Sequence, residues 1–163
     1  MKVTLICVGK IKEKYFTDGI DEYKKRLSKF CTFNIEAVAD EKTPENAPES
    51  INTKIKETEG KRILSVLNKV RTGDTYVYAL AIKGREYTSE EFSAELSRLF
   101  TVGKSHIIFI IGGSLGLSDE VLSACDGKLS FSKFTFPHQL MRLIFTEQLY
   151  RAFKIMNNEP YHK

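Results

Sequence analysis

Two periods of hydrophobic residues alternate along this chain. Near-continuous apolar runs at residues 3–9, 75–82 and 106–113 predict strands that are buried on both faces. Between them, apolar residues spaced by three and four predict helices. These helices are expected over residues 15–30, 51–70, 89–100, 118–125 and from 137 to 156. Strands alternating with helices predict an α/β domain with a mostly parallel sheet flanked by helices.

Weaker signals place the remaining elements. Residues 33–37 alternate between apolar and polar positions, which predicts a strand at a sheet edge, and residues 129–132 predict a short fifth strand. We expect Gly60 to interrupt or bend its helix, Ser89 to cap the next helix, and Pro137 to open the last one.

The length of the chain fits one domain. Its 163 residues can bury a core but are too few for two comfortable domains, so we expect a single domain over residues 1–163. The polar segment 40–50 contains two prolines and is the one linker-like stretch. Because the pieces on either side are too small to be separate domains, this segment is expected to be a loop.

Composition excludes several classes of protein. Hydrophobic residues make up 42% of the chain and charged residues 28%, as in globular rather than disordered or fibrous proteins. The apolar runs are strand-sized, so no membrane is expected as a partner. Cys7, Cys31 and Cys125 are odd in number and far apart, which fits neither a disulfide framework nor a zinc site. We expect a cytoplasmic protein without a metal.

The net charge of +4 is unevenly distributed. Residues 1–31 carry eight basic against four acidic side chains, and residues 128–163 carry six against two. The central residues 32–127 carry eleven against fifteen. If the termini meet, they form a positive face suited to a phosphate backbone. The alternative is a solvated helix surface.

A glycine-rich turn is the first candidate for chemistry. In IIGGSLGL a strand runs into Gly112, Gly113 and Gly116 before a helix, at the strand end where α/β sheets bind ligands. The spacing matches neither the dinucleotide-binding motif nor the phosphate loop. A tight turn without any ligand is the alternative.

The last helix carries the second candidate. Glu147, Arg151 and Lys154 share its expected solvent side, whereas His138 and Arg142 lie on the opposite, apolar side. Ionisable groups there require a partner, a ligand or a pocket. A core histidine bonded to a carbonyl and a structural ion pair are the alternatives. The helix is apolar over more than one face, so we expect a second burial surface, preferably a subunit interface.

The C-terminal tail is the third candidate. Pro160 ends the helix and leaves Tyr161, His162 and Lys163. Terminal residues usually fray. An aromatic ring, an imidazole and a cation together can nevertheless stack on a base, handle a proton and hold a phosphate.

These segments together resemble a known family. FIIGGSLGL, LSFSKFTFPHQLMRLIFTEQLYRAFKI and the terminal PYHK are similar to the RlmH family of ribosomal RNA large-subunit methyltransferases, which belongs to the SPOUT class. The likeness runs in register over the whole chain, including VTLICVGKIKEKY and TYVYALAIKG. Leu115 departs from it, because relatives often carry a polar or acidic residue there.

The resemblance implies an enzyme that uses S-adenosylmethionine, without a metal, to methylate N3 of a pseudouridine in large-subunit ribosomal RNA. It also implies a cytoplasmic homodimer with a C-terminal trefoil knot, a rare feature among proteins. Carried over by position, the cofactor-binding residues are Leu80, Gly112, Phe131, Ser132, Lys133, Phe134, Thr135 and Phe136. Assembled ribosomes are the expected substrate, since so small a domain has little area for reading RNA sequence.

The reaction needs a group that accepts the N3 proton. Our hypothesis is that His138 or His162 assists this step while Arg142 stabilises negative charge developing on the base carbonyls. Arg142, Tyr161, His162 and Lys163 are the expected RNA-binding residues.

Three other functions stay open from the sequence. The chain could be a SPOUT methyltransferase for another RNA nucleotide, or a ribosome-binding protein without catalysis. A nucleotide-binding module that uses the glycine turn is the third, although the phosphate-loop lysine is missing.

Overall fold

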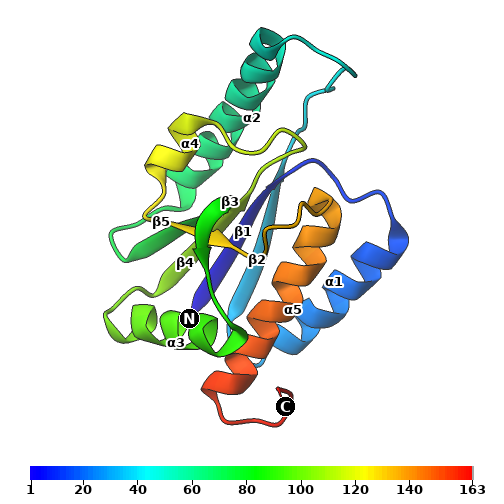
Figure 1. Ribbon diagram of the computed structural model, residues 1–163. Coiled ribbons are helices and arrows are strands. Elements are labelled where there is room, and N and C mark those ends of the chain that lie inside the picture. Colours follow the sequence, from blue (N-terminus) through cyan, green and yellow to red (C-terminus); the bar gives the residue numbers. More distant parts are fainter. Residues whose placement is uncertain (163) are drawn as a thin grey trace.

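The computed structural model describes residues 1–162 as a sheet between two layers of helices (Figure 1). The elements in chain order are β1 (Lys2–Val8), α1 (Lys14–Leu27), β2 (Thr32–Val38), α2 (Glu49–Val70), β3 (Thr75–Glu86), α3 (Ser89–Thr101), β4 (His106–Ile111), α4 (Asp119–Ala124), β5 (Gly127–Ser130) and α5 (His138–Met156). The strand order is β2-β1-β4-β3-β5, and every neighbouring pair is parallel. The predicted parallel α/β sheet is therefore confirmed.

Each face of the sheet has its own helices (Figure 1). Helices α1, α3 and α5 pack on one face, where the rings of Phe109 in β4 and Phe145 in α5 lie 4.6 Å apart. Helices α2 and α4 cover the other face around Ile63, Leu67 and Val121. The central strand β4 is buried along its whole length, which explains its unbroken run of apolar residues.

The strand β2 lies at the sheet edge, as its alternating pattern predicted. The predicted interruption at Gly60 was wrong, because α2 continues through this residue from Glu49 to Val70. Gly60 is buried where α2 meets the start of α4. A methyl group on Gly60 would collide with the hydroxyl of Ser118, so close packing requires this glycine.

The start of α3 also differs from the prediction. Thr88, not Ser89, is the N-cap. The Thr88 hydroxyl accepts the Glu91 N–H at 3.2 Å, and the Glu91 carboxylate accepts the Thr88 N–H at 2.8 Å. The Ser89 hydroxyl instead donates to the side-chain oxygen of Gln148 in α5 at 2.8 Å, which ties the two helices together.

Two strands have other bounds than predicted. β3 continues past Ile82 to Glu86, with a shift in its register to β5 between Leu80 and Arg85. The fifth strand begins at Gly127 and ends at Ser130, so that Phe131 already belongs to the segment after it.

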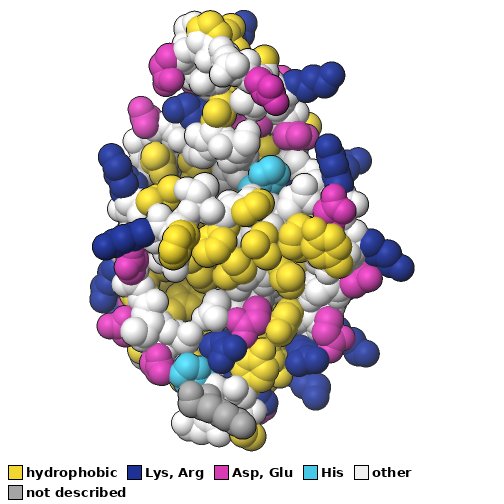
Figure 2. Space-filling model, turned by 45° about the vertical axis from the view of Figure 1, so that its right-hand side comes forward, with side chains coloured by type: hydrophobic (Ala, Val, Ile, Leu, Met, Phe, Trp, Pro, Cys, Tyr) yellow, Lys and Arg dark blue, Asp and Glu magenta, His cyan; other side chains and the backbone are white. Residues whose placement is uncertain are grey.

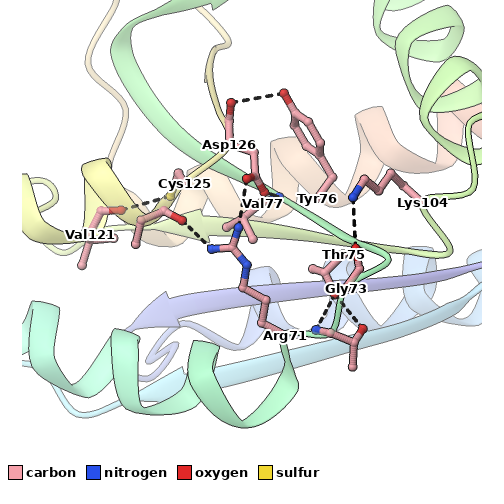
Figure 3. A network of polar contacts seen from close by, with 11 residues as sticks. Arg71, Gly73, Thr75, Tyr76, Val77, Lys104, Val121, Cys125 and Asp126 are labelled. Carbon is pink, nitrogen blue, oxygen red and sulfur yellow. Dashed lines mark hydrogen bonds and ion pairs between the residues drawn. The ribbon is translucent and has the colours of Figure 1, made fainter.

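A cluster of polar contacts fixes the start of β5 (Figure 3). Arg71, at the end of α2, donates to the carbonyl of Ala124 at 2.7 Å and pairs with Asp126 at 2.9 Å. The other carboxylate oxygen of Asp126 accepts the Val77 N–H of β3 at 2.8 Å. The Arg71 side chain at the end of α2 and the backbone of β3 thus hold Asp126 in place, one residue before β5 begins.

Over the described residues, none of the helices combines the length and apolar character that crossing a membrane would require.

Candidate functional site

The carboxyl ends of the central strands border a cavity of about 620 Å³. Parallel strands place their carboxyl ends at one edge of the sheet, where open α/β sheets bind ligands. Seven of the eight predicted cofactor-binding residues line the cavity, namely Leu80, Gly112, Phe131, Ser132, Phe134, Thr135 and Phe136. Lys133 is exposed and is not among the lining residues.

One wall of this cavity is the glycine turn, residues 112–116. The Gly116 N–H donates to the Gly113 carbonyl at 3.1 Å and closes the turn. Gly116 has a φ of +83°, a conformation that favours glycine. A side chain on Gly112 would lie 2.6 Å from the backbone of Gly116. These glycines therefore let the backbone itself form the wall.

The segment between β5 and α5 forms another wall of the cavity. The Ser132 hydroxyl accepts the Phe134 N–H at 3.0 Å, which turns the chain sharply. The ring of Phe131 packs edge-on against Phe92 and Phe145, whereas Phe134 is 79% exposed. Apolar side chains with backbone polar groups between them suit a flat heteroaromatic ring.

His138, the first residue of α5, lies at the cavity. Burial lowers its pKa, the neighbouring charge of Arg142 lowers it further, and Asp40 opposes both effects. The imidazole is therefore neutral at neutral pH and has a lone pair with which to accept a proton.

Arg142 lies one turn further along α5 but does not line the cavity. The side chain is buried, and its Nη2 donates to the carbonyl oxygens of Val8 and, at 2.9 Å, of Gly9. Burial lowers its pKa. Within residues 1–162 its Nε has no hydrogen-bond partner. The guanidinium thus joins α5 to the end of β1. Of the two residues that were predicted together at the pocket, only His138 lines the cavity.

The tail folds back along α5, away from the cavity. Tyr161 donates to Glu147 at 3.0 Å, and the Nε2 of His162 lies 2.6 Å from Glu90 in α3. Arg151 is 3.3 Å from the Nδ1 of His162 and lies over the Tyr161 ring. Neither tail residue lines the cavity in this chain, and Lys163 lies outside the described residues.

The tail also corrects the expected solvent side of α5. Glu147, Arg151 and Lys154 were expected to face water, yet their side chains are only 19%, 25% and 13% exposed. The returning chain covers them, and Glu159 pairs with Lys154. The helical periodicity correctly grouped these three side chains on one side of α5, but it could not predict that the C-terminal tail packs on that side.

Sequence reasoning missed the role of the loop after β2. The hydroxyls of Thr43 and Ser114 are 3.2 Å apart, so this loop reaches the glycine turn. Glu59, in α2, lies beneath the same turn and is only 4% exposed. The sequence offered only one indication of this role, a glutamate followed by a glycine in the middle of a predicted helix. It could not show which residues that glutamate contacts.

Comparison with known families identifies the class of this protein. The family model described as "Predicted SPOUT methyltransferase" matches residues 1–162. The chain belongs to the SPOUT methyltransferase family, and the resemblance drawn from the sequence is confirmed.

Individual relatives narrow the family further. The chain is 56% identical to the "Ribosomal RNA large subunit methyltransferase H" of Lactiplantibacillus plantarum, and each chain is covered completely. Proteins with the same name from Exiguobacterium sp. and Bifidobacterium animalis subsp. lactis are 54% and 55% identical, again over both full lengths.

A solved structure agrees at the level of the fold. A probable methylase family protein from Haemophilus influenzae superimposes with a TM-score of 0.53 at 14% identity, covering 99% of this chain and 70% of that one. At this identity the likeness shows a shared fold alone.

Proposed function

We propose that this chain transfers a methyl group from S-adenosylmethionine to N3 of a pseudouridine in large-subunit ribosomal RNA, acting on assembled ribosomes. The observation that carries the proposal is the apolar cavity beside the glycine turn, in a chain more than half identical over its whole length to proteins named ribosomal RNA large subunit methyltransferase H. When bound, the cofactor supplies an activated methyl group on a sulfonium.

The residues present fit such a cofactor. Leu80 and the segment 131–136 provide apolar walls, and Gly112 lets the backbone approach closely. Within residues 1–162, no group of three or more His, Cys, Asp and Glu side chains is arranged to hold a metal ion. Methyl transfer requires in-line placement of donor and acceptor, which a preformed cavity provides.

His138 is the proton acceptor that we favour. It lies at the cavity with a lowered pKa, so it can take the imide proton of N3 as that nitrogen is methylated. Arg142 lies one turn further along α5, and in this proposal its positive charge would stabilise negative charge that develops on the carbonyls of the RNA base. His162 contacts Arg151, which lies about three to four helical turns beyond His138, roughly 20 Å along the axis of α5. A role of the tail in the reaction at the cavity therefore requires a second copy of the chain.

A homodimer with a C-terminal trefoil knot is part of the proposal. Leu140, Leu143 and Ile144 of α5 keep exposed area, and Figure 2 shows a band of apolar side chains on this face. An apolar band of this kind is typical of a subunit interface. Light scattering should give about twice the chain mass of 18.6 kDa, and a monomer at micromolar concentration would contradict the dimer.

The cytoplasm is the location we propose, since ribosomes are the substrate. The basic residues near both termini would contact phosphates and orient the RNA, with Tyr161, His162 and Lys163 as the proposed RNA-binding residues. Arg142 was expected among them from the sequence, but its side chain is buried against the end of β1 and offers no surface to a phosphate.

The direct test is methyl incorporation from labelled S-adenosylmethionine into ribosomes of a strain that lacks this gene. We expect label in large-subunit RNA, located at pseudouridine N3, and little label in free ribosomal RNA or transfer RNA. Label in transfer RNA alone would indicate a different RNA methyltransferase. Ribosome binding without label, by a chain that is folded, would indicate a binding protein.

A further inference from the structure

Glu59 is a buried carboxylate that the proposed reaction does not use. Its Oε1 accepts the N–H of Glu41 at 2.9 Å. Its Oε2 is buried without a hydrogen-bond partner in the described part of the chain. Leaving a carboxylate oxygen unpaired away from water is costly, so a position of this kind requires an explanation.

The unpaired oxygen lies directly against the glycine turn. A methyl group added to Gly113 would lie 2.7 Å from the Oε2 of Glu59, so the bare Cα of this glycine rests on the carboxylate. The next residue of the helix, Gly60, packs just as closely on Ser118. Two consecutive residues of α2 therefore pack against the glycine turn at Gly113 and against Ser118, two residues after that turn.

The same stretch of α2 also holds the loop after β2. Arg62 donates to the carbonyl of Ala39 at 2.9 Å and pairs with the carboxylate of Glu41. The Thr43 hydroxyl then meets that of Ser114 at 3.2 Å. The loop, α2 and the glycine turn thus form one connected unit, and Glu59 is the side chain that touches both other parts.

We propose that Glu59 is a positioning residue of the cofactor site. Its carboxylate holds residues 112–116 against residues 39–43, so that the backbone wall of the cavity keeps its shape when the site is empty. The inference rests on the proposed function for the identity of the ligand, but the mechanical connection is independent of it. A wall that is already in place spares the ligand the cost of ordering it.

Two variants of Glu59 distinguish the effect of the side chain's shape and hydrogen bond from the effect of its charge. Glu59→Ala removes both contacts, and we expect about a tenfold rise in the Kd and KM for S-adenosylmethionine, with a smaller change in kcat. Glu59→Gln keeps the acceptor for the Glu41 N–H and the shape beside Gly113, so it should bind close to the wild type. Calorimetry and steady-state kinetics measure these constants.

The control variant is Leu67→Ala, two turns along the same helix. Leu67 is buried in the core on this face, and its truncation should destabilise the fold without moving the Kd. Hydrogen exchange supplies a readout without any ligand: amides of 39–43 and 112–116 should exchange faster together in Glu59→Ala and remain protected in Leu67→Ala.

Each outcome decides between the alternatives. Unchanged exchange in both segments of Glu59→Ala, or a Kd equal to that of Leu67→Ala, would make Glu59 an ordinary core residue and overturn the inference. If the wild type itself fails to bind S-adenosylmethionine, the proposed function is wrong, and hydrogen exchange alone still decides whether Glu59 connects the two segments.

Discussion

The two ends of α5 bring together the same pair of side chains, a histidine and an arginine, in opposite surroundings. At the cavity end, Arg142 is bonded to carbonyl oxygens of β1 and His138 lies beside it. At the far end, Arg151 pairs with Glu147 at 2.5 Å, and the tail residue His162 pairs with Glu90. Within residues 1–162, acidic side chains are therefore bonded to both the histidine and the arginine at the far end, and to neither at the cavity end.

This difference separates a stabilised surface from a reactive one. Carboxylates at the far end bond to the guanidinium of Arg151 and to the imidazole of His162 in an ordinary network of partly exposed polar contacts. At the cavity end burial lowers the pKa of both His138 and Arg142, which means that their environment disfavours the charged forms. Groups with perturbed pKa values beside a cavity are candidates for chemistry.

Replacing the two arginines should give the largest contrast. Arg142→Met leaves the carbonyl oxygens of Val8 and Gly9 without their buried donor, and we expect a loss of about 2–4 kcal/mol in the free energy of unfolding. Arg151→Met removes a partly exposed ion pair and should cost about 1 kcal/mol or less. Urea denaturation of both variants checks the comparison. Equal losses would show that the buried arginine has no special structural role.

Replacing the two histidines tests the same contrast in the reaction. His138→Ala should lower turnover on saturating ribosomes by about a hundredfold or more, with little change in stability, if this side chain accepts the N3 proton. His162→Ala should have a smaller effect, because its side chain lies away from the cavity of its own chain. Near-normal turnover of His138→Ala would remove His138 from the mechanism.

The pH dependence sharpens this prediction. A base must be neutral to accept a proton, so turnover should fall as the pH drops through the pKa of His138, which burial lowers below its usual value. In the unfolded chain the same imidazole binds a proton more readily, so His138 also lowers the stability as the pH falls below about 6.5. The acid limb should disappear in His138→Ala.

Much of the fold could be predicted because burial on both faces is visible along the chain. The runs in β1 and β4 are apolar at nearly every position, which is the pattern of strands buried on both faces of a parallel sheet. The roles of Gly60 and Ser89 were misjudged because they depend on contacts that the pattern along the chain does not show. The close contact of Gly60 with Ser118 and the bond from Ser89 to Gln148 join residues far apart in sequence.

The candidate site divides in the same way. The glycine turn and the segment after β5 could be located, since strand ends and glycines mark them. The carbonyl partners of Arg142 and the neighbours of Glu59 could not, because a charged residue in a helical pattern shows its charge but not its partner. The docking of Tyr161 on Glu147 likewise depends on the path of the chain after α5.

The strand order also governs how the chain forms during synthesis. Strand β1 pairs directly with β2 on one side and with β4 on the other. The Thr4 hydroxyl of β1 lies 2.8 Å from the Nε2 of His106 in β4, although the two residues are 102 positions apart in the sequence. At about 5–20 residues per second, translation adds that many residues in roughly 5–20 s. During that interval the apolar strand β1 has only β2 beside it. The β4-facing edge of β1 therefore stays unpaired until β4 has left the ribosome. An unpaired apolar strand edge favours aggregation, so this edge of the nascent chain needs protection during that interval.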